Sequence, residues 1–185
     1  TVNALSFLKQ QQAVPDQKPM FYLGHSLGEY NALFAAGVFD FATGLRLVRE
    51  RGALMAEARG GGMAAIIGMG AEQVASVLEK EGLNTIDVAN MNTPEQTVIS
   101  GLAEEISGVQ GVFQAAGARL CIPLKVSGAF HSRHMKSAQE KFARLLAETT
   151  FATPSTPVIS NVTARPYQAE DVASLLAEQL VSPVK

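Results

Sequence analysis

The stretch Gly24-His25-Ser26-Leu27-Gly28 indicates the fold of this chain more clearly than any other. It lies between an apolar run, Met20–Leu23, and a helix-forming run, Leu27–Ala36. A Gly-x-Ser-x-Gly pattern between a strand and a helix is typical of a nucleophile elbow, whose tight turn lifts the serine to the positive end of the helix. Side chains larger than glycine would collide on either side of the serine. A plain strand-to-helix turn is the alternative, but the flanking strand and helix favour a nucleophilic Ser26, with the Leu27 N–H available to an oxyanion.

Length, composition and charge limit the class of protein. The 185 residues suffice for one domain or for a large and a small subdomain, and 47% hydrophobic against 17% charged residues can build a core. A net charge of −2 gives no electrostatic basis for binding nucleic acid or an anionic membrane surface. No apolar run is long enough to span a bilayer, and Thr1–Gln12 lacks the pattern of a signal peptide. The single Cys121 excludes an internal disulfide, which favours a reducing cytoplasm.

Most of the chain outside residues 60–124 is predicted to be helical. Met20–Leu23 shows no alternation and predicts a strand buried on both faces, as in a parallel sheet, and Val158–Val162 predicts another strand. Gly37 is a candidate C-terminal cap and Asp40 a candidate N-terminal cap. A loop is expected over Ala13–Lys18, and helices over Val2–Gln11, Leu27–Ala36, Phe41–Ala58, Arg133–Glu148 and Val172–Leu180.

A second unit is expected to begin at the glycine run Gly60–Gly62 and to end at Leu124. Its predicted order is β-α-β-β-α-β, which is the ferredoxin-like arrangement. The sequence therefore predicts an α/β protein in which a small subdomain, residues 60–124, is inserted into a large one, residues 1–59 and 125–185. The expected strands are Met63–Ile67, Ile86–Asn90, Thr97–Ser100 and Arg119–Pro123, and the helices are Ala71–Glu81 and Ala103–Ala116, the latter weakened by two glycines.

Arg51 interrupts the apolar face of the helix predicted over Phe41–Ala58. A guanidinium held there is costly unless an anion pairs with it. On the pattern alone, a structural ion pair with a carboxylate of this protein is favoured. The alternative is a site that binds a substrate carboxylate through the bidentate fork of arginine.

A serine hydroxyl needs a base to take its proton, and the chain has three histidines. His25 neighbours Ser26 around a sharp turn and is expected to support the elbow, and His134 is expected to face solvent. His131 lies in a Gly/Ser-rich loop, where it is equally a candidate base or an ordinary loop histidine. His131 and His134 have no third ligand nearby, so no metal is expected. No Asp or Glu stands out as a third member of a triad, and a backbone or amide carbonyl is an alternative means of holding the imidazole.

Five ordered motifs resemble the malonyl-CoA:acyl-carrier-protein transacylase family, and most closely the stand-alone acyltransferases that serve polyketide synthases in trans. The resemblance covers nearly the whole chain and implies an α/β-hydrolase-like large subdomain with a parallel sheet and an inserted ferredoxin-like small one. The motifs are GHSLGEYNALFAAGVFDF (Gly24–Phe41), RGALM (Arg51–Met55), GMAAIIG (Gly62–Gly68), ANMNTPEQTVISG (Ala89–Gly101) and PLKVSGAFHSRHM (Pro123–Met135).

The resemblance also implies a role for individual residues. Ser26 is similar to the family's acyl-accepting nucleophile and His131 to its base. Arg51 is similar to the arginine that grips the free carboxylate of malonate, which reverses the preference for a structural ion pair. Phe130, which fills the place of a bulky residue in malonyl-selective members, and Met55, at the end of RGALM, are the other expected substrate-binding residues. Gln179 matches the position whose carbonyl orients the histidine.

The activity implied is transfer of a malonyl group from coenzyme A to the phosphopantetheine thiol of an acyl carrier protein, in polyketide or fatty acid synthesis. Malonyl-CoA and the carrier protein are the expected partners, and no cofactor is expected. Two alternatives are a hydrolase that clears acyl groups from carrier proteins and a non-catalytic docking fragment. The family's N-terminal Gly-Gln-Gly-Ser-Gln segment and its C-terminal continuation have no counterpart here, so the chain is expected to be an internal portion of the domain.

Overall fold

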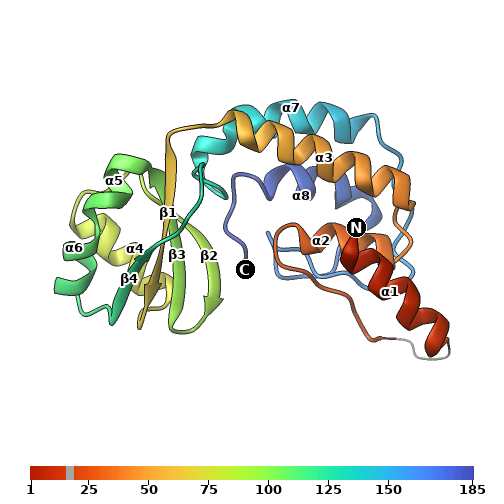
Figure 1. Ribbon diagram of the computed structural model, residues 1–185, viewed down its shortest axis with the longest axis horizontal. Coiled ribbons are helices and arrows are strands. Elements are labelled where there is room, and N and C mark those ends of the chain that lie inside the picture. The colour runs from red at the N-terminus through yellow and green to blue at the C-terminus, as the bar shows by residue number, and fades with distance from the viewer. Residues whose placement is uncertain (16–18) are drawn as a thin grey trace.

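A computed structural model describes residues 1–15 and 19–185 of the chain (Figure 1). Helices and strands are both present, so the predicted α/β class is confirmed. The loop expected over Ala13–Lys18 includes residues 16–18, which lie outside the described residues. Within residues 1–15 and 19–185, no helix combines the length and the apolar character that crossing a membrane requires.

Four strands form one antiparallel sheet with the order β2-β3-β1-β4. Strand β1 therefore lies inside the sheet, between β3 and β4. The order of helices and strands along residues 61–123 is the predicted one, but the helix expected over Ala103–Ala116 is divided at Val109. The strands are β1 (Gly61–Ile67), β2 (Asp87–Thr93), β3 (Gln96–Leu102) and β4 (Leu120–Pro123), and the helices are α4 (Ala71–Lys80), α5 (Ala103–Gly108) and α6 (Gln110–Ala115).

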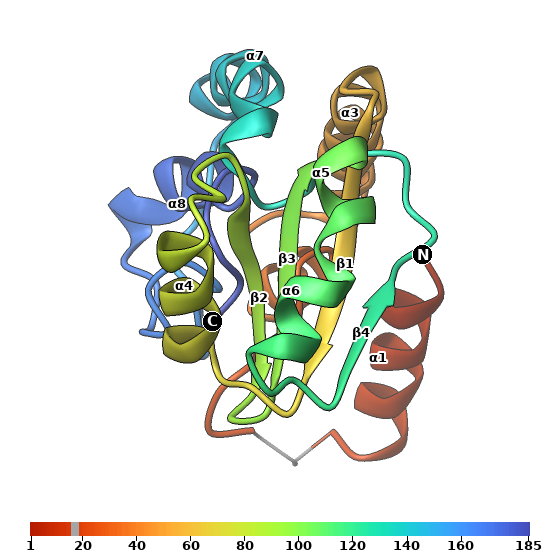
Figure 2. The same cartoon turned by 90° about the vertical axis from the view of Figure 1, so that its left-hand side faces the viewer.

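Helices α4, α5 and α6 cover one face of this sheet (Figure 2). Alternate residues of β1 point to opposite faces, as the period of a strand requires. Ala64 and Ile66 belong to the core under the helices, whereas Met63 and Ala65 belong to a smaller cluster on the other face, against which Phe130 packs. The sheet thus presents its second face toward the rest of the molecule.

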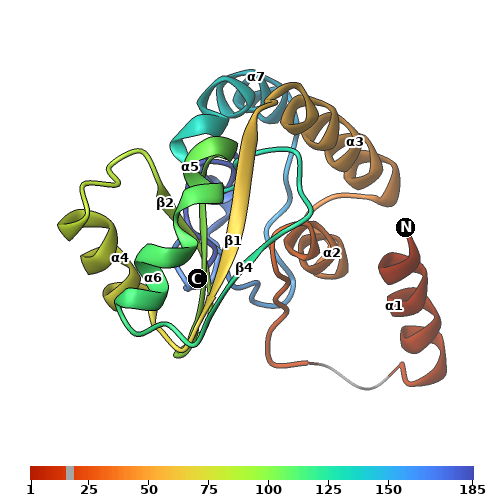
Figure 3. The same cartoon turned by 60° about the vertical axis from the view of Figure 1, so that its left-hand side comes forward.

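A separate hydrophobic core lies among the helices that precede and follow the sheet in sequence. Helices α3 and α7 lie side by side, with α8 beneath them, and α1 lies at the periphery beyond α2 (Figures 1 and 3). Phe142, Leu33 and Leu47 are among its fully buried side chains. The helices are α1 (Val2–Ala13), α2 (Gly28–Ala35), α3 (Phe41–Glu57), α7 (Lys136–Ala147) and α8 (Val172–Glu178), with short 3-10 turns at Arg133–Met135 and Ala169–Asp171.

The predicted helix caps of α2 and α3 are confirmed. Gly37 has a φ of +74°, and its N–H donates to the carbonyl of Phe34 while that of Val38 donates to Leu33, which ends α2 in a Schellman motif. Asp40 accepts a hydrogen bond from the N–H of Thr43 at 2.8 Å, which begins α3. Hydrogen bonding from Thr43, first of all from its backbone N–H, lowers the pKa of the Asp40 carboxyl.

The strands predicted at Met20–Leu23 and Val158–Val162 are wrong in extent. Tyr22 forms a single parallel bridge with Val158, and Met20, Phe21 and Leu23 are 85%, 48% and 64% exposed. A strand buried on both faces needs partners along both edges and cover on both sides. Within the described residues, the run before the elbow has only this one bridge, so it is extended but not part of a sheet.

Candidate active site

Ser26 occupies the strained tip of the turn that precedes α2. Its φ is +50°, a left-handed conformation that residues other than glycine adopt rarely and that is common at functional sites. The N–H groups of Gly28 and Glu29 bond back to the carbonyls of His25 and Ser26, at 2.8 and 3.1 Å, which closes the turn. The predicted elbow is therefore present.

Only one of the two glycines that flank Ser26 is required by close packing. A Cβ atom on Gly24 would lie 2.1 Å from the carbonyl carbon of Gly28, whereas a Cβ on Gly28 would meet no heavy atom within 4 Å. The expectation that both positions exclude side chains is thus correct for Gly24 and wrong for Gly28. The turn places the backbone of Gly28 where a side chain on Gly24 would lie, whereas a side chain on Gly28 would point into open space.

His131 lies directly against the serine. Its Nε2 atom is 2.8 Å from Ser26 Oγ, and its Nδ1 atom is 2.7 Å from the main-chain oxygen of Gln179. A carbonyl oxygen can only accept, so Nδ1 carries the proton and Nε2 presents its lone pair to the serine hydroxyl. The pKa of His131 is lowered to about 4, chiefly by burial and also by the nearby Arg51 cation, against the opposing effect of the bond to Gln179. The imidazole is therefore neutral near pH 7 and able to accept a proton.

The other two histidines are directed elsewhere. His25 Nε2 lies 3.2 Å from Asn92 Oδ1, and His134 Nε2 lies 2.9 Å from the main-chain oxygen of Thr85. Of the three candidate bases, only His131 contacts Ser26.

Arg51 reaches the same serine from helix α3. Its side chain is 6% exposed, and Nη2 donates to Ser26 Oγ at 3.0 Å and to Gln179 Oε1 at 2.9 Å. Its guanidinium carbon also lies 5.7 Å from the centre of the Tyr30 ring. No salt bridge among the described residues includes Arg51, and its buried Nε has no hydrogen-bond partner there. The direct ion pair that the sequence pattern alone favoured is thus absent from the described part of the chain, and burial lowers the pKa of the guanidinium.

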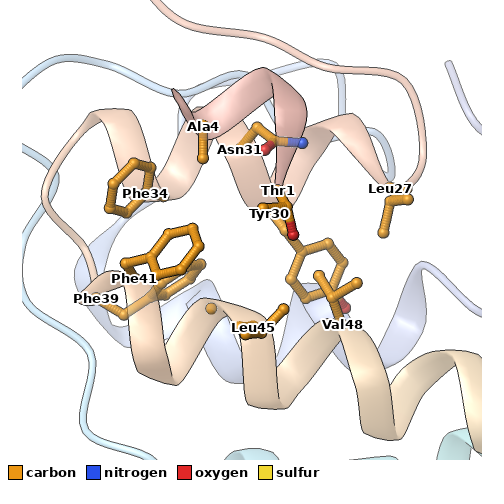
Figure 4. Close-up of a pocket in the computed structure, with 11 residues that line it drawn as sticks. Thr1, Ala4, Leu27, Tyr30, Asn31, Phe34, Phe39, Phe41, Leu45 and Val48 are labelled. Atoms are coloured by element: carbon orange, nitrogen blue, oxygen red, sulfur yellow. The ribbon is translucent and has the colours of Figure 1, made fainter. Parts of the chain in front are cut away.

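A cavity of about 430 Å³ opens beside these three side chains. Met55 and Phe130 line it, together with Met63 and Asn90 from the sheet. Its walls therefore come from the helical core and from the face of the sheet that is not covered by α4, α5 and α6. A small second cavity, of about 70 Å³, lies among α1, α2 and α3 (Figure 4), and none of Ser26, His131 and Arg51 lines it.

Sequence comparison assigns the chain to a family. The sequence profile of the acyl transferase domain matches residues 7–185. The chain belongs to this family. The malonyl CoA-acyl carrier protein transacylase BaeC of polyketide biosynthesis in Bacillus velezensis is 52% identical over 185 residues, which are 100% of this chain and 64% of BaeC.

Solved structures resemble this acyl transferase domain closely. A malonyl CoA-acyl carrier protein transacylase from Burkholderia pseudomallei matches with a TM-score of 0.91 and 47% identity, over 99% of this chain and 63% of that one. A type II PKS acyl-carrier protein in complex with its malonyl-transacylase matches with a TM-score of 0.92 and 37% identity, over 99% and 61%. The chain thus spans less than two thirds of the length of these relatives.

Two residues that hold the elbow of the acyl transferase domain were not expected from the sequence. Asn161 accepts the Ser26 N–H at 2.6 Å and donates to the Gly24 carbonyl at 2.8 Å, and its own N–H bonds to the buried carboxyl of Glu29 at 2.7 Å. Glu29 stands within the quoted GHSLGEY motif, but nothing in the pattern links Asn161 to a serine 135 positions away. Asn161 occupies the Ser26 N–H, whereas the N–H of Leu27, the next residue, has no acceptor among the described residues and is open to an oxyanion.

Proposed function

We propose that this domain transfers a malonyl group from coenzyme A to the phosphopantetheine thiol of an acyl carrier protein, through an ester on Ser26. The observation that carries the proposal is the cation of Arg51, held 3.0 Å from a serine oxygen that also contacts a neutral imidazole. A hydrolase of neutral acyl groups would have no use for a buried guanidinium beside its nucleophile. The names of the relatives, which describe malonyl transfer and a carrier-protein complex, support the same assignment.

In the first half-reaction the Ser26 hydroxyl gives its proton to His131 Nε2 as Oγ bonds to the thioester carbon. The oxyanion that forms accepts the Leu27 N–H, and Arg51 holds the free carboxylate of the malonyl group. Collapse of this intermediate breaks the C–S bond, and the imidazolium returns its proton to the sulfur of coenzyme A. In the second half-reaction the carrier thiol gives its proton to His131 as its sulfur bonds to the ester carbon. Collapse of this intermediate breaks the bond between that carbon and Ser26 Oγ, and the imidazolium returns the proton to Oγ.

The architecture proposed is an α/β-hydrolase-like large subdomain, residues 1–59 and 125–185, and a ferredoxin-like small subdomain, residues 60–124. The two separate hydrophobic cores and the antiparallel order β2-β3-β1-β4 support this division. The cavity then lies between the subdomains, where an acyl group is shielded from water. A cytoplasmic location remains a prediction, which is based on the single cysteine, Cys121.

The direct test is to incubate the full-length protein with malonyl-CoA labelled in the malonyl group and to map the label by peptide mass spectrometry. We expect an acid-stable ester on Ser26 that a carrier thiol removes, and no label in a Ser26→Ala variant that retains its fold. Label that is absent from Ser26 in the folded wild type would overturn the proposal.

A further inference from the structure

The carboxyl of Glu29 lies beneath the active site without reaching the cavity. Its side chain is fully buried, at 0% exposure, in the first turn of α2. Oε1 accepts the N–H of Asn161 at 2.7 Å and the hydroxyl of Tyr167 at 2.8 Å, and Oε2 accepts Nε2 of Gln179. Glu29 is not needed for the proton transfers of the proposed reaction, and its bond to Asn161 supports the elbow, but its bond to Gln179 requires another explanation.

These contacts fit a carboxylate and not a carboxylic acid. A backbone N–H and an amide NH₂ can only donate, and the Tyr167 hydroxyl donates to Oε1. A proton on Oε2 would point at the hydrogens of Gln179. Although burial raises the pKa of Glu29, the three donors and the nearby Arg51 cation oppose that shift.

Glu29 fixes the orientation of the Gln179 amide. With Nε2 bound to Glu29 and, at 3.1 Å, to the Ser26 carbonyl, Oε1 faces Arg51 Nη2 at 2.9 Å. The reversed amide would set its oxygen against a carboxylate and its NH₂ group against a guanidinium. Only one orientation therefore satisfies both neighbours, and in it the side chain of Gln179 connects a buried anion to a buried cation.

We propose that Glu29 is a positioning residue for recognition of the substrate carboxylate. Through the Gln179 amide it holds the Arg51 guanidinium beside Ser26, and its negative charge offsets that cation while the cavity is empty. This inference rests on the proposed function, because it explains how the malonyl anchor is held in place. Glu29 should therefore affect anionic acyl groups and leave neutral ones nearly unaffected.

The main test is Glu29→Gln, which keeps the shape of the side chain. The oxygen of the new amide must stay on the Asn161 N–H, which supports the elbow, so its NH₂ group faces Nε2 of Gln179. The Gln179 amide then turns, and its NH₂ group repels Arg51. We expect the second-order rate of Ser26 acylation by malonyl-CoA to fall 10- to 100-fold. The rates with acetyl-CoA and with a serine-directed phosphonate should change less than threefold.

Two further variants separate positioning from general support of the fold. Tyr167→Phe removes a different donor to Glu29 and should leave the malonyl-to-acetyl rate ratio within twofold of the wild type. Gln179→Met breaks the connection at its middle while keeping the main-chain oxygen that holds His131. It should reproduce the malonyl-specific loss, and the double variant Glu29→Gln, Gln179→Met should lose no more than either single one.

Each outcome decides the inference. The inference is overturned if Glu29→Gln loses activity equally with malonyl-CoA, acetyl-CoA and the phosphonate, or if its rates are unchanged. If Glu29→Gln does not fold, an unchanged malonyl-to-acetyl rate ratio in Gln179→Met overturns it. A wild type that takes up no malonyl group would refute the proposed function instead. Crystal structures of the wild type and Glu29→Gln then decide about Glu29, since the inference requires that Arg51 Nη2 leave Gln179 Oε1 in the variant.

Discussion

The Nδ1 atom of His131 lies 2.7 Å from the main-chain oxygen of Gln179, and no carboxylate takes that place. The chain therefore holds the tautomer of its candidate base with a neutral acceptor. The bond to this neutral acceptor raises the pKa of the imidazole less than a carboxylate would, so the lowering by burial dominates. Five predictions rest on this geometry and on the geometry around Ser26.

The reactivity of Ser26 should depend on pH through His131. Because burial lowers the pKa of His131 to about 4, the base is neutral above that value and protonated below it. The rate of inactivation by a serine-directed phosphonate should be level from about pH 6 to 8 and fall as the pH drops through about 4. His134→Gln should leave this profile unchanged, and a midpoint near the ordinary histidine pKa of about 6.5 would contradict the burial argument.

The lowered pKa of His131 should also make the free energy of unfolding depend on pH. The folded-state pKa of His131 is below the unfolded value, so the unfolded chain binds more protons between the two values. The stability contributed by the neutral imidazole is therefore complete above about pH 6.5 and is lost as the pH falls toward 4. Urea unfolding of the wild type and His131→Gln should show a stability difference that shrinks over this range.

Arg51→Ala should remove selectivity for an anionic acyl group. Loss of charge-assisted hydrogen bonds to the malonyl carboxylate costs about 1.5–3 kcal/mol, so malonyl loading should fall about 10- to 150-fold. Acetyl loading should fall less, since the neutral acyl group has no such bond to lose. Rates for both thioesters are measured on the same folded preparation, and parallel losses would assign Arg51 a structural role.

Phe130→Ala should widen acyl-group choice. The ring lines the cavity beside Ser26 and His131, so its removal makes room for an α-methyl group. One methyl group in an apolar pocket is worth about 1–3 kcal/mol, and the ratio of methylmalonyl to malonyl loading should rise about tenfold. Phe130→Leu serves as the intermediate case, and an unchanged ratio in both variants would remove Phe130 from the selectivity determinants.

The two glycines of the elbow should differ sharply. Gly24→Ala places a Cβ 2.1 Å from the carbonyl carbon of Gly28 and should destabilise the fold by more than about 4 kcal/mol or prevent folding. Gly28→Ala meets open space at the start of a helix and should change stability by less than about 1 kcal/mol. Urea unfolding measures both, and a benign Gly24→Ala would mean that the turn relaxes without strain.

Local features of this chain were predictable because their causes are local. The caps at Gly37 and Asp40, and the individual strands of the small sheet, follow from residues a few positions apart. The elbow was predicted from five residues. By contrast, the motif preceding it predicted a buried strand at Met20–Leu23, because an apolar run does not reveal how many strands lie beside it.

The contacts that assemble the site could not be predicted from hydrophobic periodicity or from the spacing of motifs. Ser26 meets His131 across 105 positions and Asn161 across 135, and Arg51 meets Gln179 across 128. Physical reasoning placed Arg51 on an apolar face, and the structure has it buried there; the paired anion that the same reasoning called for is not found among the described residues. The roles expected for His131 and Gln179 came from resemblance, and the positions of Glu29 and Asn161 became visible only in three dimensions.

Gln179 supplies its backbone to the imidazole and its side chain to the guanidinium. The distance between the base and the cation therefore depends on this one residue. A displacement of the C-terminal end of α8 would move His131 and Arg51 together. Variants of this domain meant to accept longer diacids should therefore leave position 179 unchanged and alter Met55 and Phe130, which line the cavity.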